Sequence, residues 1–219
     1  GNDSLYLGFV KVLQADIYSK THNDVDESGA LMQAVEIYKD IESDYYLMVA
    51  ELRLAQALLN QGNFYDGESI LHKLIYANQV NEDARLSAIV TYAFMKATQE
   101  NPDYRAATEY YSEIYEQYNG RFMKPKDYWA YAFSLEQIGR SGESEDFVSQ
   151  RFQIDSSVTA YYWRYRIEKY KGNDLAALPF LEKALIKNNI EVTETLKQSV
   201  ARIQKDYYES QYREAALLV

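Results

Sequence analysis

The sequence predicts an all-α protein, a solenoid of about five helical hairpins followed by a long C-terminal capping helix. Apolar and small residues recur at three- and four-residue steps along most of the 219 residues. Helix breakers are few, with 9 Gly and 3 Pro, so long regular elements are expected. A hairpin-like pattern also returns after 40, 37 and 33 residues, an interval typical of stacked helical repeats.

The stretch 44–77 shows the hairpin pattern most clearly. Leu47 and Leu54 belong to a wide apolar face on a first helix. Gly62-Asn63 then interrupts the pattern, which resumes around Leu71. Two amphipathic helices separated by a tight turn form a helical hairpin, which can bury its apolar face only against its neighbours.

Three later segments repeat this layout. In all four hairpins a small residue lies early in the second helix, and these residues are Gly67, Ala107, Ser144 and Ala177. The repeats predict one domain over 1–219, with hairpins at approximately 3–42, 44–77, 81–118, 125–153 and 157–187 and a capping helix over 191–219. The first hairpin is expected to have a longer connection, from Ser19 to Gly29. The apolar end of the capping helix suggests that the natural chain continues.

These segments resemble the tetratricopeptide repeat. The resemblance rests on Ala55, Gly62-Asn63-Phe64 and Leu71, and on the stretch 171–177 with Leu181 and Ala184. It implies a right-handed α-α superhelix whose first helices line a concave groove that accepts a peptide. Arg151 departs from the pattern because it stands where the family has a small residue, and two of the repeat intervals are longer than the family's.

The chain also resembles tetratricopeptide-type lipoproteins and membrane-anchored regulators common in Bacteroidetes. The residues that carry this resemblance are 34–38 and 198–208. It implies a protein of the cell envelope, facing the periplasm or anchored by lipid, although a cytoplasmic location stays open. Any contact with a membrane would be made by segments outside the given chain.

Composition disfavours most enzyme and nucleic-acid functions. The chain has no Cys and two His, so thiolate nucleophiles, zinc fingers and histidine-based metal sites have little raw material. Its formal net charge of −10 gives no global support for contacts with nucleic-acid phosphates. We therefore expect a protein with no cofactor, no metal and no nucleic-acid partner.

Two patterns could carry chemistry. Residues 24–29 place oxygen ligands and a Gly as an EF-hand calcium loop does, but position twelve is Val35 and not Glu. A helix-capping loop is the favoured interpretation of this stretch. Carboxylate pairs such as Glu109 and Glu113 could support a helical hydrolase or lyase, although at helical spacing such pairs are usually solvated. His72, lying beside Leu71, is interpreted as a packing or edge residue.

Aromatic and basic residues predict a binding strip on the first helices of three hairpins. With Gly139 and Gly172 as turn markers, the predicted peptide-binding residues are Tyr92, Lys96, Trp129, Phe133, Gln137, Tyr162, Arg166 and Lys169. Exposed Trp, Tyr and Arg often anchor protein interfaces. The alternative, that these large side chains pack between repeats, is equally open for each residue.

Basic residues gather near this strip in an otherwise acidic chain, at 121–126 and 164–171. Such a lining favours an acidic or carboxylate-ended peptide. The alternative is that these cations pair with neighbouring carboxylates such as Glu168, Glu182 and Asp174. The predicted function is a non-catalytic scaffold that binds a protein or peptide. The alternative is the sensor or regulatory domain of a larger membrane-anchored signalling protein.

Overall fold

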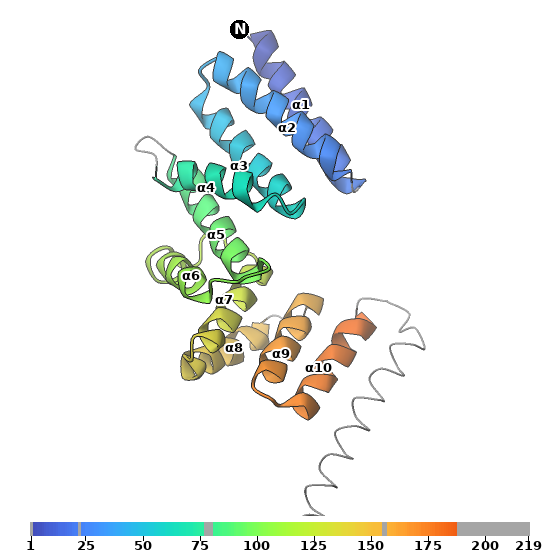
Figure 1. The fold of residues 1–219 in the computed structure, drawn as a ribbon, viewed down its shortest axis with the longest axis vertical. Helices are drawn as coiled ribbons and strands as arrows, with labels where there is room; N and C mark the ends of the chain where they lie inside the picture. Colours follow the sequence, from blue (N-terminus) through green and yellow to red (C-terminus); the bar gives the residue numbers. More distant parts are fainter. Residues whose placement is uncertain (1, 22, 77–80, 155–156, 188–219) are drawn as a thin grey trace, which may run out of the picture. The chain divides into compact units, whose positions relative to one another are not determined.

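The computed structural model describes residues 2–21, 23–76, 81–154 and 157–187, and these are all-α. They contain ten α-helices and no strand (Figure 1). The helices are α1 (Asn2–Lys20), α2 (Asp24–Asp40), α3 (Asp44–Asn60), α4 (Phe64–Tyr76), α5 (Glu82–Thr98), α6 (Tyr104–Tyr118), α7 (Pro125–Gln137), α8 (Ser141–Ile154), α9 (Val158–Tyr170) and α10 (Asp174–Lys187). The all-α prediction is confirmed. The predicted capping helix over 191–219 lies outside the described residues.

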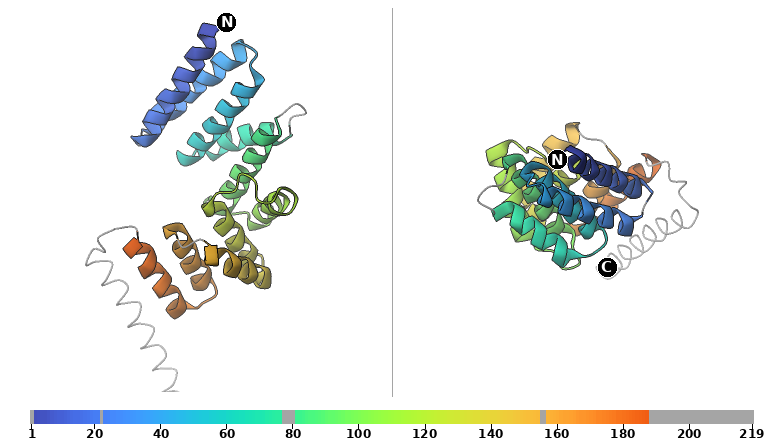
Figure 2. Two further views of the ribbon diagram at one scale, coloured as in Figure 1. Left: turned by 180° about the vertical axis from the view of Figure 1, so that it is seen from behind. Right: turned by 90° about the horizontal axis from the view of Figure 1, so that it is seen from above.

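The chain forms two compact units, Gly1–Met123 and Lys124–Val219. In unit 1, each helix from α1 to α6 packs against the next one along the chain, and α3 also contacts α5. In unit 2, α7 contacts both α8 and α9, and α9 packs against α10. Figure 2 shows the same pairs from behind, with α1 beside α2 and α9 beside α10. That both units belong to one repeat domain stays a prediction.

The glycine turns after α3 and α9 lie where the sequence predicted them. Helix α3 is followed by Gly62, whose φ of +79° is a left-handed conformation that favours glycine. Gly172 has the same role after α9, with φ of +77°. Between α5 and α6, the Asp103 side chain accepts a hydrogen bond from the Ala106 N–H at 3.0 Å and so caps α6.

The connection in the first hairpin is shorter than the sequence predicted. Helix α2 begins at Asp24 and not near Ala30, because Asn23 caps it by accepting a hydrogen bond from the Asp26 N–H at 3.4 Å. Residues 24–29 therefore belong to a helix and do not form a calcium-binding loop. Among the described residues, no group of three or more His, Cys, Asp or Glu side chains could hold a metal ion.

The repeated small residues are buried, and two of them, Gly67 and Ser144, lie at contacts between helices. Gly67, Ala107, Ser144 and Ala177 are all buried. A Cβ atom at Gly67 would lie 2.9 Å from the Leu59 side chain, so α3 and α4 cross too closely for a larger residue. Ser144 Oγ donates a hydrogen bond to the Ala132 carbonyl oxygen at 2.8 Å and so joins α8 to α7.

Arg151, the residue that departs from the repeat pattern, has a local partner. Its guanidinium carbon lies 3.7 Å from the centroid of the Tyr128 ring. A planar guanidinium over an aromatic face makes a cation–π contact, which lets a long polar side chain occupy a site between α7 and α8.

No helix in the described parts of the chain is both long enough and apolar enough to cross a membrane.

Candidate protein-binding surface

The predicted strip residues fall in both units. Tyr92 and Lys96 lie on α5 in unit 1, and the remaining six lie on α7 and α9 in unit 2. Several of the strip's aromatic side chains are buried. Their positions separate the residues that can meet a partner from those that hold helices together.

Helix α7 is buried on most of its circumference, which removes part of the predicted strip. Every residue from Trp129 to Glu136 is buried. Trp129 has no exposed surface and Phe133 keeps 6%. Trp129 and Phe133 therefore cannot line an exposed strip, because α7 packs against both α8 and α9. Gln137, at the end of α7, is half-buried.

Helix α9 presents the exposed part of the predicted site. We define the α9 surface as Phe133, Tyr162, Trp163, Tyr165, Arg166, Lys169 and Tyr170. Tyr162 is 47% exposed and Tyr170 is 51% exposed, whereas Trp163 keeps only 5% of its surface. The six α9 residues fall on one side of the helix. Each of them is followed or preceded by another at a spacing of three or four residues, which places both on the same helix face.

Arg166 is the centre of the α9 surface. Its guanidinium carbon lies 4.3 Å from the Trp163 ring centroid and 4.4 Å from that of Phe133 on α7. The Phe133 ring is 5.6 Å from Trp163 and 6.1 Å from Tyr170, measured between centroids. Three of the predicted site residues, Phe133, Tyr162 and Arg166, therefore gather around Trp163, whose ring is 6.4 Å from that of Tyr162.

Lys169 extends the α9 surface by one helical turn. Its Nζ donates a hydrogen bond to the Tyr165 hydroxyl at 3.3 Å and lies 5.7 Å from the Tyr165 ring centroid. Within the described residues, neither Arg166 nor Lys169 forms a salt bridge with a carboxylate. Both cations rest on aromatic rings, and both keep hydrogen-bond donors available to a ligand.

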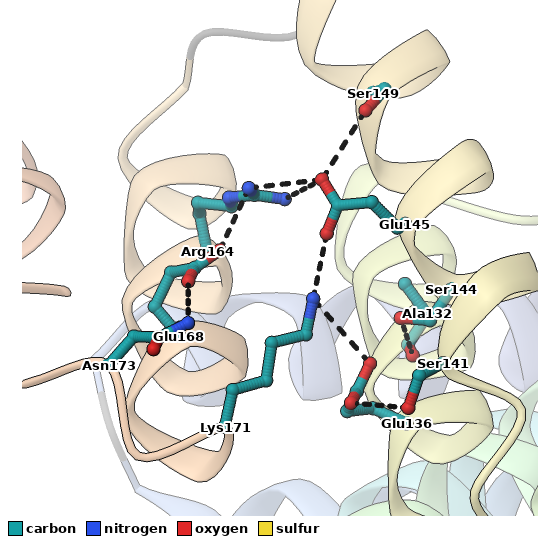
Figure 3. A network of polar contacts seen from close by, with 10 residues as sticks. All are labelled: Ala132, Glu136, Ser141, Ser144, Glu145, Ser149, Arg164, Glu168, Lys171 and Asn173. Carbon is teal, nitrogen blue, oxygen red and sulfur yellow. Dashed lines mark hydrogen bonds and ion pairs between the residues drawn. The ribbon is translucent and has the colours of Figure 1, made fainter. Parts of the chain in front are cut away.

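The opposite side of α9 has cations of the same kind in a different environment (Figure 3). Arg164 forms a salt bridge with Glu168 at 2.8 Å and another with Glu145 of α8 at 3.2 Å. Lys171 donates a hydrogen bond to Glu145 at 2.7 Å and lies 3.8 Å from Glu136 of α7. This network ties the α9–α10 pair to α7 and α8.

The network favours the ionised form of Glu145. The hydrogen bond from Lys171 is the main cause of the lowered pKa of Glu145, and the Arg164 charge lowers it further against the opposing effect of burial. Asn173 donates a hydrogen bond to Glu168 at 3.1 Å, beside the Arg164–Glu168 ion pair. Arg164 and Lys171 therefore have anionic partners within the protein, as the pairing alternative predicted for Arg164 and Glu168.

Tyr92 and Lys96 belong to a separate polar cluster in unit 1. Glu68 on α4 accepts hydrogen bonds from the Tyr92 hydroxyl at 3.0 Å and from Lys96 Nζ at 2.6 Å. His72 Nε2 lies 3.0 Å from the same Tyr92 hydroxyl. The Tyr92 ring is 6% exposed and stacks edge-on against Tyr110 of α6, with 5.1 Å between centroids. The cluster joins α4, α5 and α6.

In this cluster the pKa of Glu68 is lowered and the pKa of Tyr92 is raised, so both values lie further from neutrality than usual. Burial alone would raise the pKa of Glu68, but the hydrogen bonds from Lys96 and Tyr92 and the Lys96 charge lower it overall. Burial is the main cause of the raised pKa of Tyr92, and its hydrogen bond to Glu68 adds to it. General acid–base catalysis near pH 7 needs groups whose pKa values approach neutrality. The geometry therefore favours a structural role for these side chains.

The sequence prediction missed part of the α9 surface and part of the polar cluster around Tyr92. Trp163, Tyr165 and Tyr170 were not among the predicted binding residues, although their spacing from Arg166 was a usable signal. His72 was interpreted as a packing or edge residue, and its contact with Tyr92 was missed because it joins residues twenty positions apart on different helices. Comparisons of the chain with protein-family models, with curated protein sequences and with solved structures give no match.

Proposed function

We propose that this chain is a non-catalytic helical-repeat protein that binds an acidic protein segment or peptide at the α9 surface. One observation carries the proposal. On α9, Arg164 is paired with carboxylates of the protein, whereas Arg166 and Lys169 rest on aromatic rings in the described residues. Two cations on one exposed face, in a chain with a net charge of −10, make a local positive site.

The ligand chemistry follows from the groups that the α9 surface offers. A guanidinium can donate two parallel hydrogen bonds to a carboxylate, and a lysine adds a second positive charge one turn away. Tyr162 and Tyr170, each about half exposed, offer apolar ring faces and hydroxyl groups to the rest of a peptide. This combination suits a short acidic segment that also carries an apolar residue.

The repeat architecture is part of the same proposal. The contacts α3·α5 and α7·α9 join first helices of successive hairpins, which is the packing that a right-handed superhelix of the tetratricopeptide type requires. The buried small residues at equivalent places in four hairpins support it. A protein of this type presents its first helices as a recognition surface, and α9 is the first helix of its hairpin.

A selection from a random peptide library displayed on phage tests the proposal. We expect the full chain to enrich peptides that contain Asp or Glu clusters. Synthetic copies of an enriched peptide should bind with an affinity that falls as salt rises, because the ion pairs are exposed. Failure to enrich any motif, or enrichment of motifs without acidic residues, would contradict the proposal.

A matched pair of lysine variants locates the site. Lys169→Gln removes a cation from the α9 surface, while Lys183→Gln removes an exposed cation on α10, whose Nζ lies 5.9 Å from the centroid of the Tyr161 ring on α9. Lys169→Gln and Lys183→Gln each remove one positive charge, so the net charge of the two variants is the same. We expect Lys169→Gln to weaken binding of the selected acidic peptide about three- to tenfold, which corresponds to about 0.7–1.4 kcal/mol. Lys183→Gln should leave the affinity within about twofold, since its side chain lies on another helix.

A further inference from the structure

Helix α1 carries two apolar stripes, and its inner stripe is covered by its own unit. Leu5 and Val12 pack against a core formed by Ala34, Tyr38 and Ala50. Ala15, on the same side of α1, is completely buried in a second core. This inner stripe accounts for the packing of α1 against α2.

The outer stripe of α1 is exposed. It consists of Tyr6, Val10, Leu13 and Ile17, which are 66%, 46%, 60% and 61% exposed. Their spacing of four, three and four residues is the a/d spacing of a coiled-coil seam. Four large apolar side chains aligned on one helix face make an unusual surface for a protein in water, and such a patch marks a contact site.

We propose that the outer stripe is a homodimer interface, in which α1 of one copy packs antiparallel against α1 of a second copy. The charges at the two ends of the stripe support this occupant. Asp3 and Lys20 are both exposed and continue the same heptad positions as the apolar residues. The stripe thus has an anionic end, an apolar centre and a cationic end.

This order of charges is complementary to itself only in the antiparallel direction. Antiparallel pairing about a two-fold axis between Lys11 and Val12 sets Asp3 opposite Lys20 of the second copy, and Tyr6 opposite Ile17. Val10 then faces Leu13, so each layer pairs an a position with a d position. Parallel pairing would place Asp3 against Asp3 and Lys20 against Lys20, which is repulsive.

The contact also has a low ordering cost. An isolated helix of this length is only marginally stable in water, so pairing of free helices must pay for helix formation. Here α1 is already held as a helix by its inner stripe against α2. The seam from Asp3 to Lys20 is about 26 Å long at 1.5 Å per residue, which gives six paired layers.

Sedimentation velocity of the full chain over a range of concentrations tests the dimer. We expect a concentration-dependent monomer–dimer equilibrium. Leu13→Glu should weaken dimerisation at least tenfold, because each dimer contains the change twice. Ile186→Glu is the matched control, since Ile186 on α10 is 62% exposed, and it should leave the equilibrium unchanged. Circular dichroism verifies that both variants keep their helix content.

Single-cysteine variants test the direction of pairing, because the natural chain contains no Cys. In the antiparallel dimer, Tyr6→Cys and Ile17→Cys proteins cross-link when mixed under oxidising conditions, whereas neither cross-links alone. Two copies of position 6 would lie about 16 Å apart along the seam, beyond the reach of a disulfide. A monomer at all concentrations, an unchanged dimer in Leu13→Glu, or cross-linking of Tyr6→Cys by itself would each overturn the proposal.

Discussion

Removing Arg164 should destabilise unit 2 far more than removing Arg166, although the two residues lie on the same helix. The Arg164 side chain is 17% exposed and that of Glu168 is 8% exposed. Replacing Arg164 with Met keeps the apolar stem but leaves Glu168 buried with only Asn173 as a hydrogen-bond donor. The variant tests whether this ion pair holds α9 in place.

The expected loss in the free energy of unfolding follows from the burial of the Glu168 carboxylate, which loses its cationic partner in Arg164→Met. Breaking a buried pair by removing one partner costs about 3–5 kcal/mol. The remaining hydrogen bond from Asn173 places this case near the lower end, at about 3 kcal/mol. Glu145 adds little because its side chain is 42% exposed and keeps Lys171 as a partner. Arg166→Met loses only contacts with aromatic rings, so we expect about 1 kcal/mol or less.

Urea unfolding followed by tryptophan fluorescence measures this difference in unit 2 alone. Both tryptophans, Trp129 and Trp163, belong to that unit. With a urea slope of about 1.5 kcal/mol/M, a loss of about 3 kcal/mol lowers the unfolding midpoint by about 2 M. The double variant Arg164→Met/Glu168→Met should recover most of the loss, because it removes both charges. Equal destabilisation by Arg164→Met and Arg166→Met, or no recovery in the double variant, would refute the reasoning.

Three further predictions concern unit 1 and are followed by circular dichroism during urea unfolding. Gly8→Ala should destabilise by about 1–3 kcal/mol, because the added Cβ would overlap the Tyr38 ring; a neutral effect would contradict this packing. Tyr92→Phe should cost about 1–2 kcal/mol through the hydrogen bond lost to Glu68, and an unchanged midpoint would disprove that contribution. The lowered pKa of Glu68 contributes stability that is complete above its unfolded pKa of about 4.3 and is lost as pH falls through the folded pKa. Glu68→Gln should therefore flatten the decline in stability below about pH 4, and an equally steep decline would be inconsistent with this role.

The turns after α3 and α9 could be predicted because they depend on local sequence. Gly62 and Gly172 adopt the left-handed conformations that end a helix, and Asp103 supplies a side-chain cap. The small residues of the repeat were also visible in the sequence, and the structure shows that they are buried, with Gly67 at a close contact between α3 and α4. These features need only a residue and its neighbours along the chain.

The burial of Trp129 could not be predicted in the same way. Periodicity identifies a helix with one apolar face, but α7 is buried at eight successive positions and has no such single face. The different environments of Arg164 and Arg166 also could not be predicted from the sequence. Glu145, which pairs with Arg164, is on another hairpin, so only tertiary packing decides which cation on α9 is neutralised.

The most direct test of the proposed function uses the two tryptophans as separate probes. Trp163 lies 4.3 Å from the Arg166 guanidinium in the α9 surface, whereas Trp129 is completely buried in α7. The full chain labelled with 5-fluorotryptophan should give two ¹⁹F NMR signals, assigned with Trp163→Phe. Adding an acidic peptide selected from the library should shift the Trp163 signal saturably and leave the Trp129 signal in place. An unmoved Trp163 signal at saturating peptide, or a shift confined to Trp129, would contradict the account.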